Sequence, residues 1–230
     1  MEHYFIPRKY DKKDILEYGA VLFGRPYTFY SLKGLFSYQG VDEGTMALLN
    51  AIMKSGEDIH GNVLDLGCGI GVIGIVLAKN FKINLTMSDV NSNAIDIASM
   101  NVQKYGISAK VVESDSFENL KDRYEYIISN PPIKAGKQVL FDMVLKSYYH
   151  LFKGGKIILV IRKDLGMESL KKAMFERFGN VNILSRDKGY YILESEKWDD
   201  ITMADEIDKK QDIFKKIEYI EELNTDIYER

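Results

Sequence analysis

The chain of 230 residues contains one cysteine, three histidines and no apolar segment that approaches the length of a membrane span. Cys68 cannot form a disulfide within the chain, so we expect a protein of the reducing cytoplasm. Residues 1–4 lack the basic-then-apolar pattern of a secretory signal, which agrees with that expectation. Because the histidines are widely spaced and form no metal-ligand pattern, no metal site is predicted.

Hydrophobic residues make up 46% of the sequence, enough for a sizeable core, and this composition excludes wholesale disorder. The charge is distributed unevenly. Residues 199–230 contain 11 acidic and five basic residues, a net charge of −6, which leaves +3 for residues 1–198 because the total is −3. The acidic segment also has apolar positions that fit an amphipathic helical tail. The weak acidity of the whole chain therefore does not argue against a polyanionic partner for residues 1–198.

Strand and helix patterns alternate along the middle of the chain. We expect strands at 63–66, 83–88, 109–113, 125–129 and 156–161, and helices at 72–79, 91–104, 139–152 and 168–178. Two further strands, 181–185 and 190–194, flank turn residues 186–189 and form a hairpin. This order predicts an α/β fold with a doubly wound, Rossmann-like sheet of seven strands that ends in an antiparallel pair.

The segment before this alternation has its own pattern. Residues 20–30 are typical of a hairpin, and residues 43–54 of a helix with Asp42 as its N-cap. We expect residues 1–60 to pack on the sheet as an extension of one domain that ends at residue 198.

A glycine-rich turn joins the first strand of the alternation to its helix, with Gly67, Gly69 and Gly71 free to bring backbone close to a ligand. Its spacing also matches the dinucleotide fingerprint. However, Asp65 precedes the turn, and a carboxylate there would repel a pyrophosphate. The turn therefore favours S-adenosylmethionine, which carries an ammonium and a sulfonium group and no phosphate.

Acidic residues follow three successive strands, at the carboxyl-end crevice where such folds bind ligands. We expect Asp65 to meet the amino acid end of the cofactor, directly or through a water, and Asp89 to bind the ribose hydroxyls. Asp115 can accept a hydrogen bond from the adenine amino group. Singly, Asp65 could be a helix cap and the others ordinary loop acids. The predicted cofactor set is completed by neighbours of these acids and the next strand end: Val90, Ser116 and Asn130.

The tetrad Asn130, Pro131, Pro132 and Ile133 follows the strand 125–129 directly. Asn130 supplies a side-chain carbonyl, and the peptide before each proline is a rigid acceptor. Two fixed acceptors suit a primary amino group, which offers two hydrogens. The tetrad therefore predicts chemistry on an NH2 nitrogen and a catalytic role for these four residues.

Together these segments resemble the class I S-adenosylmethionine-dependent methyltransferases, and more narrowly the small-methyltransferase domain of ribosomal RNA small subunit methyltransferase C. The resemblance spans roughly residues 20–197. It implies methylation of guanine N2 in 16S rRNA, and a segment, 34–45, that closes over the methionine end of the cofactor. It rests on residues 34–37, 41–45, 65–71, 89–91, 130–137, 161–163 and 186–191.

Ile133 departs from the tyrosine or phenylalanine that many amino methyltransferases have at this position to stack on a base. This weakens the case for adenine N6, cytosine N4 or glutamine as the acceptor. Four cations are expected on the rim formed by the carboxyl ends of the strands, the same edge of the sheet as the tetrad. They suit RNA phosphates, although any single lysine is more often a solvated loop charge. They are Lys134, Lys137, Arg162 and Lys163.

The sequence is also compatible with alternative functions. The acceptor could be a tRNA base, a protein glutamine or a small molecule, or the chain could be a non-catalytic RNA-binding relative. The intact acids and tetrad argue against the last alternative. The acidic tail most simply packs on the domain's own surface, and an acidic flap over a basic RNA surface is the other interpretation.

Overall fold

The computed structural model describes residues 10–132, 136–203 and 205–206. The chain divides into two compact units, residues 1–198 and 199–230. In the second unit the described residues include Thr202, whose backbone N–H and hydroxyl both donate to Asp205. The predicted helical tail lies mostly outside the described residues. No helix in the described part of the chain is long and apolar enough to span a bilayer.

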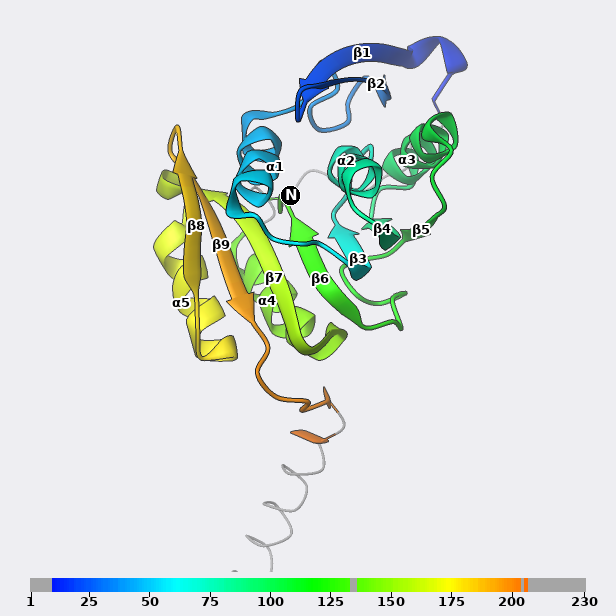
Figure 1. Ribbon diagram of the computed structural model, residues 1–230. Helices are drawn as coiled ribbons and strands as arrows, with labels where there is room; N and C mark the ends of the chain where they lie inside the picture. Colours follow the sequence, from blue (N-terminus) through cyan, green and yellow to red (C-terminus); the bar gives the residue numbers. More distant parts are fainter. Residues whose placement is uncertain (1–9, 133–135, 204, 207–230) are drawn as a thin grey trace, which may run out of the picture. The chain divides into compact units, whose positions relative to one another are not determined.

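The first unit is built on a mixed sheet of seven strands in the order β5-β4-β3-β6-β7-β9-β8 (Figure 1). The five strands from β5 to β7 are parallel, and the last two pairs are antiparallel. The predicted fold class is therefore confirmed. The strands are β3 (Gly61–Leu66), β4 (Ile83–Asp89), β5 (Ala109–Glu113), β6 (Tyr124–Ser129), β7 (Leu151–Arg162), β8 (Asn182–Asp187) and β9 (Tyr190–Glu196).

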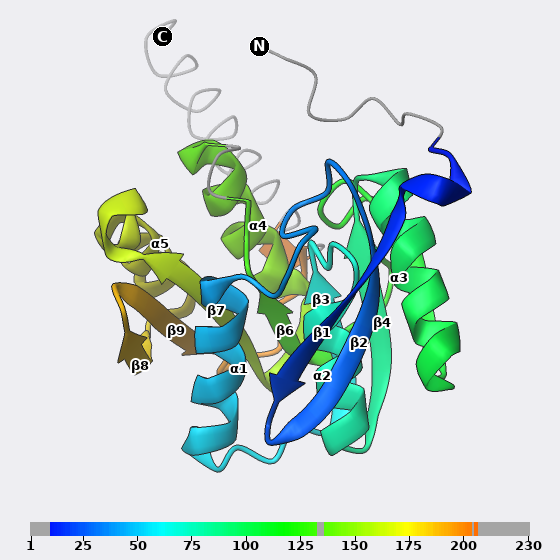
Figure 2. The same ribbon diagram turned by 90° about the horizontal axis from the view of Figure 1, so that it is seen from above.

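Helices cover both faces of this sheet (Figures 1 and 2). One face carries α1 (Glu43–Ser55), α2 (Val72–Asn80) and α3 (Ser92–Tyr105), and the other carries α4 (Lys137–His150) and α5 (Met167–Phe178). The central strands are apolar on both sides because both faces are buried, as in other parallel sheets. Their fully buried side chains include Val63, Leu64, Ile127, Ile157 and Leu159.

Several boundaries differ from the sequence prediction, and two of these differences have a clear physical reason. The helix expected at 139–152 ends at His150, because Leu151 pairs with Tyr124 and begins β7. The hairpin turn expected at 186–189 shortens to Lys188 and Gly189, both with positive φ. Two such residues give a turn whose twist matches that of the flanking strands.

The N-terminal hairpin consists of β1 (Ile15–Leu22) and β2 (Arg25–Leu32), and its strands are longer than predicted. It is held by α3 through the fully buried Asn101. The Asn101 side chain accepts from Tyr30 N (2.7 Å) and donates to Tyr30 O (2.9 Å) and Ile70 O (3.0 Å). One side chain therefore ties the hairpin, the helix and the glycine-rich turn together.

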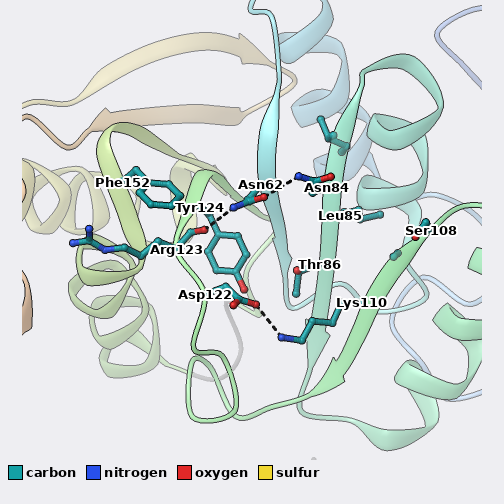
Figure 3. Close-up of a pocket in the computed structure, with 12 residues that line it drawn as sticks. Asn62, Asn84, Leu85, Thr86, Ser108, Lys110, Asp122, Arg123, Tyr124 and Phe152 are labelled. Carbon is teal, nitrogen blue, oxygen red and sulfur yellow. Dashed lines mark hydrogen bonds and ion pairs between the residues drawn. The ribbon is translucent and has the colours of Figure 1, made fainter.

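A groove of about 560 Å³ lies at the amino-terminal ends of β3, β4, β5 and β6 (Figure 3). The connection from β5 to β6, residues 114–123, is formed by turns and contains no helix. Polar side chains in the groove bind one another. Asn84 donates to Asn62 (3.1 Å), and Lys110 pairs with Asp122 (2.9 Å). These contacts connect β3 with β4, and β5 with the segment that precedes β6.

Candidate active site

The glycine-rich turn curls over the end of β4. Gly67 N and Cys68 N both donate to Ser88 O, at 2.8 and 2.9 Å. Gly67, Gly69 and Gly71 all have positive φ, between 55° and 88°. L-residues with a side chain are strained in this region, so the three predicted glycines are needed for the path of the turn.

Asp89, the last residue of β4, binds this turn with both carboxylate oxygens occupied by backbone N–H groups. Gly69 N donates to its Oδ2 and Asn91 N to its Oδ1, each at 2.9 Å. Burial raises the pKa of Asp89 above its ordinary value, although these N–H groups lower it in part. The structure brings Asp89 to the turn as predicted, and its contact with a ribose stays a prediction.

Asp65 lies deeper than the sequence suggested. It is fully buried, Gly74 N donates to its Oδ2 (2.8 Å), and its Oδ1 has no hydrogen-bond partner in the described structure. Burial raises the pKa of this carboxyl group to about 7, and the nearby charge of Asp89 adds to the shift. Its predicted contact with the cofactor's amino group stays a prediction. The observed bond places it under the turn, where it fixes the start of α2.

The loop after β5 contains Asp115, which is exposed, and Ser116, which has a positive φ of 51°. Ser114 N donates to Asp89 O (2.9 Å), so this loop and the end of β4 are neighbours. Val90 is half-buried between them. The structure therefore assembles the three predicted acids at the carboxyl ends of neighbouring strands, with Asp115 the most accessible.

Asn130, immediately after β6, faces the N-terminus of α1. Its Nδ2 donates to Asp42 Oδ1 (3.1 Å), Asp42 Oδ2 (3.2 Å) and Thr45 Oγ1 (3.0 Å). Its Oδ1 has no partner among the described residues. The side-chain oxygen is thus available as an acceptor, as the tetrad predicts.

A cavity of about 50 Å³ connects Asn130 with the glycine-rich turn. Its remaining lining comes from two segments that the resemblance had assigned only in part, the N-terminal hairpin and residues 34–45. The lining residues are Tyr18, Phe36, Ser37, Val41, Asp42, Thr45, Gly67, Cys68, Gly69, Ile70, Val72, Ile73 and Asn130.

Tyr18 is a site residue that the sequence analysis missed. Its hydroxyl is buried without a hydrogen-bond partner in the described structure. Burial, with the charge of Asp42, raises its pKa to about 12. No local sequence pattern could have identified it, because β1 reaches the cavity through the tertiary packing of the hairpin on α3.

The structure describes only some of the other tetrad residues and predicted cations. Pro131 is buried and Pro132 exposed, whereas Ile133 and Lys134 lie outside the described residues. Lys137 is exposed at the start of α4, and Lys163 is exposed after β7. Arg162 forms a two-point ion pair with Asp164 (both contacts 3.0 Å). A phosphate would therefore compete with Asp164 for Arg162.

Metal chemistry and thiol chemistry find no support in the residues that the structure covers. No group of three or more potential ligands gathers there. Burial, together with the charges of Asp65 and Asp89, raises the pKa of the Cys68 thiol well above its usual range. A thiol that stays protonated is a poor nucleophile.

The sequence matches the methyltransferase small domain family over residues 26–194. The chain belongs to this family. It is 34% identical to the Bacillus subtilis protein YbxB, described as uncharacterized, over 200 residues that cover 85% of this chain and 98% of the relative. It is also 34% identical to ribosomal RNA small subunit methyltransferase C of Haemophilus influenzae, over 69% of this chain and 48% of the relative.

A solved structure of this methyltransferase family superposes on the chain with a TM-score of 0.73. It is the 16S rRNA guanine-N2 methyltransferase RsmC of Thermus thermophilus in complex with AdoMet and guanosine, 27% identical over 80% of this chain and 50% of that one. The chain thus spans about half the length of the small subunit methyltransferase C proteins that it matches. The predicted family and its cofactor, S-adenosyl-L-methionine, are confirmed.

The charges around the turn fit this cofactor. Asp65 and Asp89 have no cationic partner within the described part of the chain, and a ligand with an ammonium and a sulfonium group supplies positive charge. A dinucleotide would bring a pyrophosphate to the same acids, which is electrostatically unfavourable.

Proposed function

We propose that this methyltransferase modifies an exocyclic amino group of RNA, N2 of a guanine in small-subunit ribosomal RNA. The observation that carries the proposal is the hydrogen bonding of Asn130. Its amide hydrogens are held by Asp42 and Thr45, so it presents an acceptor to the cavity beside the glycine-rich turn. The target base in relatives of this family, guanine with its N2 amino group, offers matching hydrogens.

Bound S-adenosylmethionine supplies a methyl group attached to a sulfonium sulfur. The neutral thioether that forms when the methyl group is transferred is a good leaving group. The residues of this chain then need only to position the amine. Asn130 Oδ1 and the Pro131 carbonyl accept the two amino hydrogens and hold the nitrogen pyramidal. The nitrogen lone pair forms the new N–C bond, the S–C electron pair stays on sulfur, and a proton leaves the nitrogen afterwards for solvent.

Phe36 completes the proposed base site. The residue is 67% exposed, and among the exposed large hydrophobic residues in the described ranges it is the one that lines the Asn130 cavity. Leu35 is buried and anchors the loop, while Ser37 has a φ of 54°. Positive φ at a non-glycine residue stores strain that often accompanies function. We assign Phe36 the stacking role for which Ile133 lacks a ring.

The rim supports an RNA acceptor. Lys137 and Lys163 are exposed at the ends of two neighbouring segments, after the tetrad and after β7. Residues 1–198 carry a net charge of +3 despite the acidic chain. Exposed cations near this cavity would provide the phosphate contacts on which RNA affinity mainly depends.

The proposal is tested in the host that encodes the chain. Deletion of the gene should remove one N2-methylguanine from 16S rRNA, measured by mass spectrometry of rRNA and tRNA fragments. Purified protein with S-adenosylmethionine should restore it on small subunits from the deletion strain. Loss of the methyl group from tRNA instead would change the substrate, and unchanged methylation of every RNA would contradict the proposal.

A further inference from the structure

The orientation of the Asn130 amide depends on a residue that is distant in the sequence. Asp42, 88 positions earlier, accepts from Asn130 Nδ2 with both carboxylate oxygens (3.1 and 3.2 Å). The same Asp42 Oδ1 caps α1 by accepting from Gly44 N (2.9 Å) and Thr45 N (3.2 Å). These two backbone hydrogen bonds hold the carboxylate in place independently of its contact with the Asn130 amide.

The helix comes close enough for this contact because position 44 has no side chain. A Cβ at Gly44 would lie 3.1 Å from Tyr190 Cε1 and 3.4 Å from Asn130 Nδ2. The N-terminus of α1 is therefore packed directly against the end of β6 and the start of β9. Such close contact leaves the Asp42 carboxylate little freedom to move away from Asn130.

The chemistry of the partner decides which way the amide points. An ionised carboxylate only accepts hydrogen bonds, whereas the amide offers an NH2 at one end and an oxygen at the other. Rotating the amide by 180° would replace two charge-assisted hydrogen bonds with two close oxygen–oxygen contacts. Thr45 Oγ1 could pair with either end and does not discriminate.

We infer that Asp42 is a positioning residue, whose negative charge holds the Asn130 amide with its oxygen toward the acceptor amine. This inference rests on the proposed function for the identity of the amine. The orientation itself is a property of Asp42 and Asn130 alone. Asp42 thus selects an acceptor that offers N–H groups and disfavours one that needs a hydrogen-bond donor.

The variant Asp42→Asn separates charge from helix capping. Asparagine caps a helix as well as aspartate does, so its oxygen can still accept from Gly44 N and Thr45 N. Its NH2, in place of Oδ2, would face the NH2 of Asn130 and favour the flipped amide. We expect kcat to fall about 10- to 100-fold, less than the loss of about 100- to 1000-fold for removing a preorganised hydrogen-bonding group outright, because part of the population keeps the productive amide orientation. The dissociation constant of S-adenosylmethionine should stay within about twofold.

A double-mutant cycle with Asn130→Ala shows whether Asp42 acts through Asn130. In the Asn130→Ala background, Asp42→Asn should lower kcat by no more than about twofold, because no amide remains to be oriented. The full loss in both backgrounds, or a collapse of cofactor affinity, would overturn the inference. Asp42→Ser, which keeps a capping oxygen and removes the charge, is the second variant and should show the same dependence on Asn130.

A readout without turnover distinguishes this inference from the proposed function. The side-chain amide signals of Asn130 in a 1H–15N spectrum are identified by their loss in Asn130→Ala. They should shift in Asp42→Asn and stay unchanged in Asp164→Asn, a matched variant of an exposed acid at the same end of the sheet. Shifted signals with no RNA methylation would contradict the proposed function alone. Unshifted signals would contradict the role of Asp42 whatever the substrate is.

Discussion

The two ends of the sheet differ in the source of positive charge near their buried acids. At the amino-terminal end, Lys156 Nζ lies 2.8 Å from Glu57 Oε1 and 3.6 Å from Glu194 Oε2, and the Tyr126 hydroxyl donates to Glu57 (2.8 Å). Burial tends to raise the pKa of Glu57, but Lys156 and Tyr126 outweigh it and the pKa is lowered. Glu57 is thus compensated by Lys156, whereas Glu194 has only the longer ion pair with it, and burial raises the pKa of Glu194.

At the carboxyl-terminal end the acids are held by backbone N–H groups instead. Asp65 and Asp89 have no cation beside them in the ranges that the structure covers, and their pKa values are raised. An uncompensated buried carboxylate is unfavourable. At the amino-terminal end a lysine of the chain supplies the positive charge, whereas at the carboxyl-terminal end the cationic cofactor would supply it.

The largest expected effect comes from Asn130→Ala. Removing one preorganised hydrogen-bonding group from an active site costs about 100- to 1000-fold in kcat. Because Asn130 contacts the acceptor amine in our proposal, cofactor affinity should change by no more than about twofold in a calorimetric titration. Asn84→Ala, an amide at the amino-terminal end, is the control and should keep full turnover. If cofactor affinity collapsed while turnover at saturation held, Asn130 would belong to the cofactor site instead.

Asp65 gives the carboxyl-terminal end a pH dependence. Its pKa is about 7 in the folded protein and about 4 in an unfolded chain, so the folded state binds the extra proton between these values. The free energy of unfolding should therefore fall as the pH rises from 4 to 7, by at most about 1.4 kcal/mol per unit. Asp89 adds to the same slope because its pKa is also raised.

Denaturant titrations of the cofactor-free protein at several pH values measure this slope. Asp65→Asn should flatten it, and Asp164→Asn, which removes an exposed acid, should leave it unchanged. Saturating S-adenosylmethionine should flatten it as well, since a cationic ligand favours the ionised acids. If Asp65→Asn did not alter the slope, the raised pKa of Asp65 would not be the source of the pH dependence of stability.

The sequence predicted those features that depend on local pattern. The alternation of strands and helices predicted the seven-stranded sheet, and Asp42 was correctly identified as the cap of α1. The glycine-rich turn and Asp89 are where spacing and strand order predict them. These features need only neighbouring residues and the rule that parallel strands end at one edge.

The features that sequence could not predict are contacts between distant segments. Nothing in residues 42–45 indicates Asn130 as a partner, and nothing in β1 indicates that Tyr18 lines the cavity. The burial of Asp65 under the turn depends on how α2 packs, and the pairing of Arg162 with Asp164 depends on the path of the chain after β7. Each of these is set by tertiary packing rather than by spacing.

Lys156→Met tests the amino-terminal end, where stability should suffer and activity should not. The variant leaves Glu57 and Glu194 close together without their cation. Because the cluster is still partly accessible to water, we expect a loss of about 1–3 kcal/mol in unfolding free energy. This corresponds to roughly 2–4 °C in melting temperature per kcal/mol.

The matched control is Lys110→Met. Lys110 pairs with Asp122 at a similar distance of 2.9 Å, but both side chains are more than half exposed. Exposed pairs contribute about 0–1 kcal/mol, so this variant should melt close to the native protein. If Lys156→Met lowered turnover at saturation while stability held, the two ends of the sheet would not be functionally separate.

Phe36→Ala should have an effect that is limited to RNA affinity. Stacking of an aromatic ring on a base contributes about 1–3 kcal/mol, so binding should weaken about tenfold or more, and Phe36→Trp should retain it. The apolar contact is independent of ions, and the salt dependence of binding should not change. Lys137→Glu should instead reduce the salt slope by about one.

Phe175→Ala, which removes a similarly exposed ring from α5, should bind RNA normally. Equal losses of RNA affinity in Phe36→Ala and Phe175→Ala would mean that Phe36 contributes only general apolar surface. The carboxyl-terminal end of the sheet would then bind the cofactor but would not have a stacking site for the base at Phe36.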